Sequence, residues 1–325
     1  MKYRLLGNTG IRVSEVGFGT WALGGPVDVF GIPVGWGAVD DNESKAALGR
    51  ALDLGVNFFD TSNVYGNGHS EELLGECLAG KDCVIATKVG IARTETESVK
   101  DFSSKHIREA IEASLRRLKR DRVDLYQLHN PPPQVWQSNE VFDLLADLKR
   151  EGKILASGVS TSTAEEGIHL CEKKKVDSLQ ILLNIFQQEP AEKLLDIAQK
   201  NGVGIVARVP LASGLLTGKF KPGHRFARDD NRSNYLNEQR MQEALLKLDR
   251  LKEMIAGTGY SLPQVALAFV LKFNAVSAVI PGAKNVNQAQ QNVSASDAEL
   301  SAQLFESIRK EFADYNFFKR YRVRV

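Results

Sequence analysis

The sequence has few cysteines and no excess of charge of either sign. Among its 325 residues there are three cysteines, and 42 Lys and Arg stand against 40 Asp and Glu, which gives a formal net charge of +2. A nucleic-acid surface or an electrostatic membrane anchor needs a cluster of one sign, so a near-balanced charge argues against both. We therefore expect neither nucleic acid nor a membrane as a partner.

Long apolar segments are also missing. The longest unbroken apolar run covers residues 265–271, whereas a helix that spans a bilayer needs about 20 apolar residues. The N-terminus lacks the apolar core of a signal peptide. Cys77, Cys83 and Cys171 show no CxxC or metal-finger spacing, which is typical of free thiols in a reducing compartment. These features predict a soluble cytoplasmic protein without a bound metal.

Short β-branched or apolar runs alternate with longer amphipathic segments about eight times along the chain. The expected strands are residues 15–19, 56–60, 83–88, 123–129, 155–160, 178–182, 204–208 and 278–281. The expected helices are residues 43–54, 70–78, 104–119, 140–150, 163–173, 191–200, 238–256 with 263–273, and 286–293. Apolar residues that recur every three or four positions support the helical segments.

Strict alternation of strands and helices requires parallel strands joined by right-handed crossovers. An open doubly wound sheet and a closed eight-stranded barrel both satisfy this pattern. Eight similar units without a linker favour a (β/α)₈ TIM barrel, with residues 1–325 as a single domain. Two short runs, 3–5 and 11–13, predict a hairpin that plugs the bottom of the barrel. Long segments at 22–41, 130–137 and 211–237 each follow a strand, so we expect them at the C-terminal face.

Three successive expected strands end in a residue that can do chemistry: Asp60, Lys88 and His129, with Tyr65 five residues after Asp60. A structural salt bridge beside a core histidine is the alternative interpretation, since polar groups there are costly unless paired. The set suits carbonyl reduction, because an ammonium about 4 Å from a tyrosine is worth about 4 kcal/mol at an effective dielectric of about 20. Lys88 would lower the pKa of Tyr65 from about 10, Asp60 would keep Lys88 charged, and His129 would polarise the substrate oxygen.

Sequence motifs are spread from the first expected strand to the last. They are Gly19-Thr20-Trp21, Phe59-Asp60-Thr61-Ser62 with Tyr65-Gly66, Ala86-Thr87-Lys88, Asp124-Leu125-Tyr126-Gln127-Leu128-His129, Gly152-Lys153-Ile154 with Gly158-Val159-Ser160, and Ile280-Pro281-Gly282-Ala283. Together they resemble the aldo-keto reductases. The resemblance implies the barrel, NADP(H)-dependent reduction of aldehydes or ketones, and a catalytic tetrad at Asp60, Tyr65, Lys88 and His129. The hydride would come from nicotinamide and the proton from Tyr65.

The same resemblance implies a nicotinamide cofactor that lies extended over the barrel mouth. Ser160 and Gln180 would bind its carboxamide, a glycine-rich turn with Lys219 would clasp the pyrophosphate, and Lys284 would bind a 2′-phosphate at a helix N-terminus. The full expected set is Gly19, Thr20, Trp21, Asp60, Ser160, Gln180, Arg208, Pro210, Leu211, Gly214, Leu216, Gly218, Lys219, Gly282, Ala283, Lys284, Gln288, Gln291 and Asn292.

The chain departs from the family pattern at three positions in or beside this set. Arg208 stands where many members have a tyrosine that stacks on the nicotinamide, Thr161 where many have Asn, and Gln288 where many have an arginine near the adenine. A planar guanidinium can stack but also adds charge. The change at Gln288 weakens the case for NADPH, so NADP(H) is the expected cofactor with NAD(H) left open.

The substrate is expected to be a small carbonyl compound held by aromatic walls. The expected substrate residues are Trp21, Trp36, Tyr65, His129 and Trp136, with Tyr235 as a further candidate. Aromatic walls accept many carbonyl compounds, so we expect broad specificity.

Two other functions remain open at this point. A cofactor-binding regulatory subunit with little turnover is one, because potassium-channel β subunits share the family's fold and tetrad. An isomerase with a Schiff base on Lys88 is the other, although Asp60 and Tyr65 favour a charged lysine. The G-x-G-x-x-A match at 202–207 follows a helix and forms a strand, so it is not a Rossmann fingerprint. A monomer is the default for the oligomeric state.

Overall fold

The computed structural model describes residues 1–29, 32–93 and 98–320. Eight parallel strands form one sheet in the order β14-β13-β12-β11-β10-β7-β6-β3. Isolated parallel bridges, Val16 with Val279 and Gly19 with Gly282, join the first strand to the last and close the sheet into a barrel. The barrel strands are β3 (Phe18–Gly19), β6 (Phe58–Asp60), β7 (Val84–Val89), β10 (Val123–His129), β11 (Ile154–Ser160), β12 (Ser178–Leu182), β13 (Gly204–Arg208) and β14 (Val276–Val279). The predicted (β/α)₈ barrel is confirmed.

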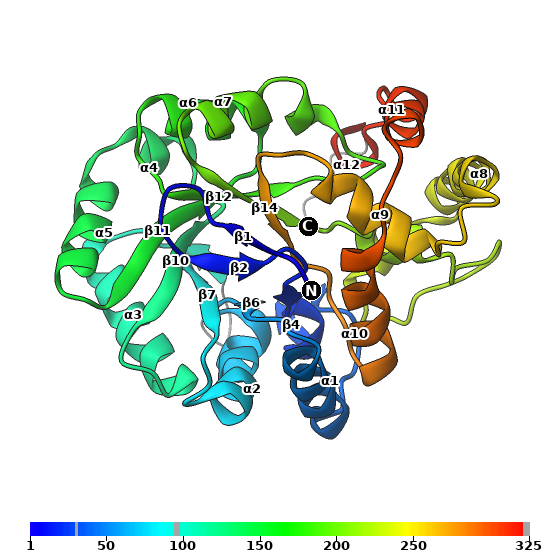
Figure 1. The fold of residues 1–325 in the computed structure, drawn as a ribbon. Helices are drawn as coiled ribbons and strands as arrows, with labels where there is room; N and C mark the ends of the chain where they lie inside the picture. The colour runs from blue at the N-terminus through cyan, green and yellow to red at the C-terminus, as the bar shows by residue number, and fades with distance from the viewer. Residues whose placement is uncertain (30–31, 94–97, 321–325) are drawn as a thin grey trace.

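Helices surround the barrel on its outer side (Figure 1). They are α1 (Asp41–Asp53), α2 (His69–Leu78), α3 (Ser104–Leu118), α4 (Pro133–Gln137), α5 (Glu140–Arg150), α6 (Ala164–Glu172), α7 (Leu194–Lys200), α8 (Glu238–Ile255), α9 (Leu262–Leu271), α10 (Val286–Val293), α11 (Ala302–Glu311) and α12 (Phe317–Arg320). In α3 the residues at the predicted apolar spacing, Ile107, Ile111, Leu115 and Leu118, are all buried. None of these helices, over the described ranges, is long and apolar enough to cross a membrane.

Some strand boundaries differ from the prediction, most clearly where the hydrogen bonding between neighbouring strands is irregular. Strands β12 and β13 begin and end at the predicted residues, but β3 covers two residues rather than the five expected at 15–19. The preceding chain still bonds to the last strand, since Gly17 donates to Val279 O and Val279 donates to Glu15 O, outside a regular ladder. Helix α11 was not predicted, although Ser301 caps it by accepting a hydrogen bond from the Leu304 amide.

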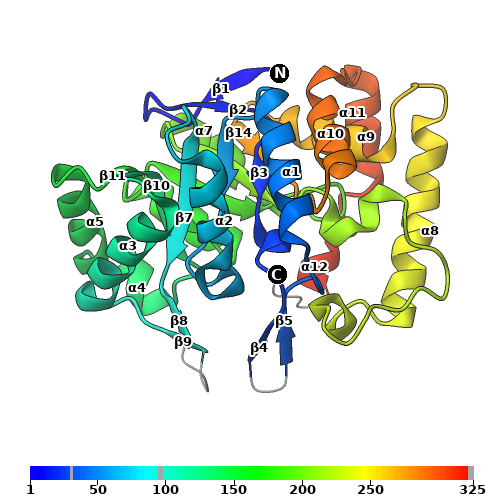
Figure 2. The ribbon, with the colours of Figure 1, turned by 90° about the horizontal axis from the view of Figure 1, so that it is seen from below.

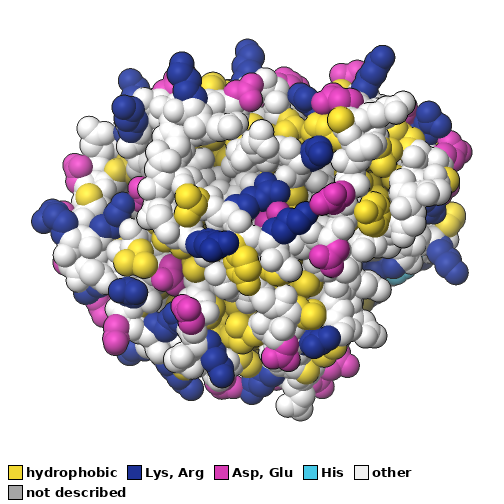
Figure 3. Space-filling view, in the orientation of Figure 1, with side chains coloured by type: hydrophobic (Ala, Val, Ile, Leu, Met, Phe, Trp, Pro, Cys, Tyr) yellow, Lys and Arg dark blue, Asp and Glu magenta, His cyan; other side chains and the backbone are white. Residues whose placement is uncertain are grey.

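The long segments lie at the end of the barrel opposite to the N-terminal hairpin (Figure 2). Segment 22–41 contains the hairpin of β4 (Val27–Val29) and β5 (Ile32–Val34). A second hairpin of β8 (Ile91–Arg93) and β9 (Ser98–Lys100), which was not predicted, follows β7 on the same side. Acidic, basic and apolar side chains are interspersed on the face that carries the N-terminal hairpin (Figure 3).

The predicted N-terminal hairpin, β1 (Tyr3–Leu5) paired with β2 (Arg12–Ser14), closes the bottom of the barrel. Leu6 and Val13 are fully buried and pack in one cluster with Phe58, Leu125 and Val206 from the barrel interior. Such a filled interior is a core and not a pore. The hairpin therefore adds the lowest layer of that core.

Glycines let the hairpin turn approach the barrel closely. A Cβ on Gly7 would lie 2.4 Å from the carbonyl oxygen of Gly202, and one on Gly204 would lie 2.7 Å from the amide of Gly7. Gly202 has φ of 70° directly after α7, as expected for a residue that ends a helix. The G-x-G at 202–204 thus serves helix termination and contact with the plug, which agrees with the rejection of a Rossmann fingerprint.

Truncation of the plug should destabilise the protein. Leu6 is fully buried and Leu5 is 60% exposed, so the two neighbours form a matched pair. We expect Leu6→Ala to lower the free energy of unfolding by about 2–4 kcal/mol through lost burial and a cavity, and Leu5→Ala to change it by less than about 0.5 kcal/mol. Urea denaturation measures both. Equal effects would show that the plug does not belong to the core.

Candidate active site

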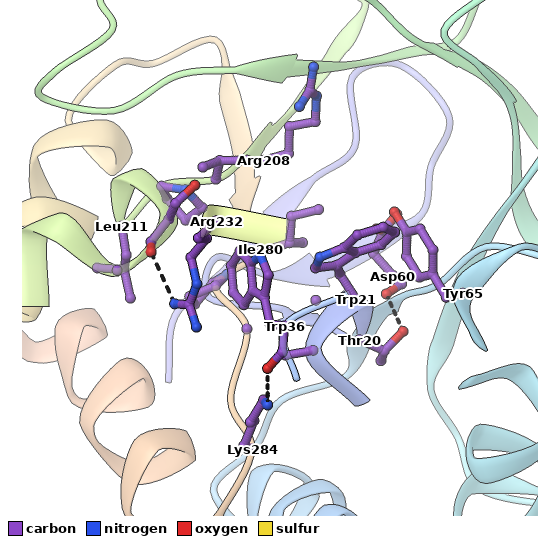
Figure 4. A pocket seen from close by; sticks show the side chains of 18 of the residues that line it. Thr20, Trp21, Trp36, Asp60, Tyr65, Arg208, Leu211, Arg232, Ile280 and Lys284 are labelled. Carbon is purple, nitrogen blue, oxygen red and sulfur yellow. Dashed lines mark hydrogen bonds between the residues drawn. The ribbon is translucent and has the colours of Figure 1, made fainter. Parts of the chain in front are cut away.

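A cavity of about 750 Å³ opens at the C-terminal mouth of the barrel. Its walls come from the ends of the barrel strands and from the long segments that follow β3 and β13. Asp60 and Tyr65 lie at one end, while Trp36, Arg232 and Lys284 lie together at the other (Figure 4). This volume and the mixture of apolar walls with a few polar groups are typical of a cofactor or substrate site.

Lys88 stands at the centre of the reactive end. Its ammonium donates hydrogen bonds to Asp60 Oδ1 at 2.5 Å, to Thr61 O at 2.8 Å and to the Tyr65 hydroxyl oxygen at 3.1 Å. A lysine has three N–H donors, so this set uses all of them. The side chain is fully buried and held in the charged form, which argues against a Schiff base at this lysine.

The second oxygen of Asp60 is held by two amides. Gln127 Nε2 donates to Asp60 Oδ2 at 3.1 Å, and Gln180 Nε2 donates to the same oxygen at 2.7 Å. Gln180, which was expected to bind a carboxamide, therefore also contacts the carboxylate. Gln127 was not among the predicted site residues, although it lies two residues before His129 in β10 and so points to the same side of the strand.

Burial dominates the proton affinity of Tyr65. It raises the pKa of the hydroxyl more than the charge and hydrogen bond of Lys88 lower it, so the net direction is upward. Lys88 lowers this pKa as expected, but the cost of burying a phenolate, which the expectation left out, outweighs that effect. Burial acts to lower the pKa of Lys88, but attraction to Asp60 and Tyr65 together with their hydrogen bonds raises it further. Lys88 stays charged and Tyr65 stays protonated at neutral pH.

The Tyr65 ring packs against a tryptophan and a histidine. The Trp21 ring packs edge-on against the Tyr65 ring, with 4.8 Å between the ring centroids. The His129 ring also packs edge-on against Tyr65, with 6.0 Å between the centroids. The Nδ1 atom of His129 is 3.2 Å from Ser62 Oγ, which fixes the ring at the end of β10. The structure thus brings Asp60, Tyr65, Lys88 and His129 together, as predicted from three strand ends.

Positive charge gathers at the far end of the cavity. The Lys284 ammonium donates to Trp36 O and, at 3.1 Å, to Ala38 O. Burial and the neighbouring charge of Arg232 both lower the pKa of Lys284, and the same causes lower that of Lys219. These shifts show that the three cations are close enough to repel one another, and such a cluster favours a bound anion.

Arg232 holds that end of the cavity together. It forms a buried ion pair with Asp230, with Nη2 2.5 Å from Oδ2, and donates to Ser213 O at 3.3 Å. Its guanidinium also stacks over the Trp36 ring at 4.8 Å. Sequence reasoning did not select Arg232, because a charged residue in a long loop looks like ordinary solvated surface.

Most of the predicted cofactor residues line the cavity, and three do not. Leu216 and Ala283 are buried in the core, and Gly218 ends a 3₁₀ turn with φ of 76°. Their motifs reach the cavity through neighbours instead, since Thr217, Lys219, Gly282 and Lys284 line it. Among the predicted substrate residues, Trp21, Trp36, Tyr65 and His129 line the cavity, as does Tyr235.

Trp136 is the exception among the predicted substrate residues. It lies in α4 and packs edge-on against His169 of α6, with 5.0 Å between ring centroids, and it is not one of the cavity-lining residues. Lys175 holds the C-terminal end of this helix by donating to the carbonyls of Gln137 and Ser138. The structure therefore does not bring Trp136 to the wall of this cavity, whereas Ile91 and Asn130 line it without having been predicted.

Comparison with known proteins agrees with this geometry. The model of the Aldo/keto reductase family matches residues 15–311. The chain belongs to the aldo/keto reductase family. Aldo-keto reductase YhdN of Bacillus subtilis (strain 168) is 31% identical over 298 residues, which cover 89% of this chain and 87% of that protein. A probable voltage-gated potassium channel subunit beta of Oryza sativa subsp. japonica is 31% identical over 316 residues, covering 91% and 92%.

A solved structure of an aldo-keto reductase relative has the same fold. The glycerol dehydrogenase AKR11B4 from Gluconobacter oxydans superposes with a TM-score of 0.83 at 30% identity, and the match covers 96% of this chain and 95% of that one. The family assignment therefore rests on sequence and on structure over nearly the whole length.

Removal of the Lys88 charge should destabilise the protein, because Asp60 would stay buried without its cation. We expect Lys88→Met to lower the free energy of unfolding by about 3–5 kcal/mol. The double variant Lys88→Met with Asp60→Asn removes both charges and should recover more than half of that loss. Urea denaturation of the two variants measures this, and a single variant as stable as the parent would contradict the role given to the ion pair.

Proposed function

We propose that the chain is an NADP(H)-dependent oxidoreductase that reduces small aldehydes or ketones to alcohols. The observation that carries the proposal is the hydrogen bond from the buried Lys88 ammonium to the Tyr65 hydroxyl at the cavity floor. Tyr65 is thereby a proton donor whose conjugate base has a cation beside it. Family membership supports an oxidoreductase in general.

The residues around the cavity fit a nicotinamide dinucleotide. Lys219, Arg232 and Lys284 supply positive charge for phosphates, and Gly214, with φ of 91°, belongs to a 3₁₀ turn that lines the cavity beside Lys219. Ser160 and Gln180 line the reactive end, where the nicotinamide ring would be held. When bound there in its reduced form, the cofactor would supply a hydride to the carbonyl carbon.

The chain's own residues handle the proton. Tyr65 donates its hydroxyl proton to the carbonyl oxygen, and Lys88 stabilises the phenolate that this transfer leaves. Asp60 keeps Lys88 charged and in place through the 2.5 Å contact. His129, fixed through Nδ1, and Trp21 position the carbonyl group against the Tyr65 hydroxyl. Because burial raises the pKa of Tyr65, the donor stays protonated through neutral pH.

Loss of the Tyr65 hydroxyl should nearly abolish reduction. We expect Tyr65→Phe to lower kcat with NADPH and 4-nitrobenzaldehyde by at least about a hundredfold, because a general acid contributes about that much. NADPH binding, followed by fluorescence, should change by less than about threefold. Tyr235→Phe is the matched control: Tyr235 also lines the cavity but donates to Ser213 Oγ, so its loss should cost only a few fold. Full activity in Tyr65→Phe would refute the proposed proton donor.

The preference for NADPH over NADH rests on Lys284. We expect Lys284→Ala to weaken NADPH binding at least about tenfold, the usual effect of losing a hydrogen bond to a charged group, and NADH binding less than about threefold, because NADH has no 2′-phosphate. Lys221→Ala is the control, since Lys221 is exposed in the neighbouring loop. Equal weakening of both cofactors would show that Lys284 only supports the Trp36 loop.

A regulatory subunit that binds the same cofactor is the second candidate. The resemblance to a probable potassium channel subunit beta over 91% of this chain favours it. Tight NADPH binding without turnover of a panel of aldehydes and ketones by the unmodified protein would support that candidate. We place either function in the cytoplasm, with a monomer as the default to be checked by light scattering.

A further inference from the structure

We propose that Gln127 is a positioning residue of the reaction: its amide fixes the carboxylate of Asp60, and through it the line from Asp60 to Lys88 to Tyr65. The proposal rests on the proposed reductase function and adds a residue to its machinery. Gln127 is fully buried, and Asp60 and Gln180 are 2% and 1% exposed. Its side chain therefore acts on these neighbours and not on solvent.

The barrel geometry explains why these three side chains meet. Asp60, Gln127 and Gln180 come from β6, β10 and β12, which are alternate strands of the sheet. In such barrels, side chains from alternate strands share one layer of the interior. The three residues thus form a polar layer at the floor of the cavity, where Asp60 and Gln180 line it. Below it the interior is apolar, with Phe58 and Leu125 in the barrel cluster.

A glycine in the intervening strand gives Gln127 its space. Gly158 of β11 pairs with Gln127 on one side and with Ser178 on the other. A Cβ at Gly158 would lie 3.3 Å from Gln127 Cγ and 2.8 Å from Ser178 O. A side chain at position 158 would displace Gln127 or Ser178, so the glycine in β11 leaves room for the Gln127 side chain.

Hydrogen-bond counting gives Gln127 its function. Asp60 Oδ1 receives Lys88, while Oδ2 receives both amides. Gln180 Nε2 also lies 3.4 Å from Gln127 Oε1, so the two amides orient each other. Without Gln127, Oδ2 keeps one donor and the carboxylate can rotate. Rotation moves Oδ1, and Lys88 then loses the acceptor that aims its third N–H at Tyr65.

The test compares Gln127→Met with Leu125→Met. Methionine fills a similar volume but cannot donate to Asp60, and Leu125 is a buried residue on the same face of β10, two positions earlier. We expect Gln127→Met to lower kcat about tenfold, in line with the loss of a hydrogen bond to a charged group, with the KM for NADPH changed by less than about threefold. Leu125→Met should change kcat by less than about twofold.

The pH profile separates positioning from loose packing. Lys88 lowers the pKa of Tyr65 against the opposing effect of burial, so a misplaced Lys88 lets that pKa rise. The rising limb of alcohol oxidation, which needs a deprotonated Tyr65, should therefore move to higher pH in Gln127→Met and stay in place in Leu125→Met. An unmoved limb together with an unchanged kcat would overturn the proposal.

A double-variant cycle with Asp60→Asn tests whether Gln127 acts through the Asp60 carboxylate. If Gln127 acts through the carboxylate, Gln127→Met should cost less than about twofold in kcat when Asp60 is already Asn, and its effect on the urea midpoint should shrink as well. A full additional tenfold loss of kcat, or equal shifts of the urea midpoint in both backgrounds, would contradict the proposal.

The urea midpoints can be measured without turnover, so they test Gln127 even if the unmodified protein reduces no carbonyl and the proposed function fails. Gln127→Asn, too short to reach Asp60, replaces Gln127→Met if that variant does not fold.

Discussion

The buried ammonium of Lys88 is the constraint on which the reactive end of this barrel depends. Taking a cation out of water costs several kcal/mol even after relaxation, and the cost is offset only if every N–H finds an acceptor. Three acceptors meet at this point: a carboxylate from β6, a carbonyl one residue later and the hydroxyl of Tyr65. Because each acceptor belongs to a different part of the barrel mouth, Lys88 fixes the position of Tyr65, the proposed proton donor, relative to Asp60 and Thr61.

The polar layer is tolerated because the rest of the barrel is apolar and sealed. Below Asp60 and Gln127 the interior is filled by Phe58 and Leu125, and Leu6 from the hairpin closes the end. Stability therefore comes from the lower layers, while the upper layer carries groups that a purely structural core would avoid. The close glycine contacts of the plug, at Gly7 and Gly204, belong to the lower end of the barrel.

Sequence alone predicted which of the proposed catalytic residues lie together, because the positions of strand ends follow from the topology of the barrel. Once alternation had indicated parallel strands, the carboxyl ends of β6, β7 and β10 had to meet at one rim, and so did Asp60, Lys88 and His129. Gln127 could have been found by the same reasoning, since the two-residue period of a strand places it on the side of His129. It was missed because a glutamine has no acid, base or charge that indicates a role in the reaction until its hydrogen-bond partner is known.

The loops were harder to predict because long-range contacts decide their paths. Nothing local indicates that Arg232 will stack on Trp36, a residue distant in the sequence. An antiparallel bridge between Trp36 and Asp230 brings the two segments together at the same end of the cavity. Trp136 illustrates the opposite case, since a tryptophan after the strand that ends in His129 was expected in the cavity, but in the structure it lies in α4 and packs against His169 of α6. Local composition identified which loops matter and not where their side chains point.

The far end of the cavity differs from the reactive end in how its charge is balanced. Lys88 is paired with the carboxylate of Asp60. Lys219, in contrast, lies near two other cations, Lys284 and Arg232. The carboxylate at this end, Asp230, is already paired with Arg232. Burial lowers the pKa values of Lys219 and Lys284 most and repulsion between the cations lowers them further, so an anion between them would relieve the repulsion. Lys284 meanwhile bonds to Trp36 O and Ala38 O, so an anion must compete with the loop for that ammonium. Under the proposed function, cofactor binding would therefore be coupled to the Trp36 loop through Lys284, because a phosphate bound by this ammonium would replace its hydrogen bonds to Trp36 O and Ala38 O.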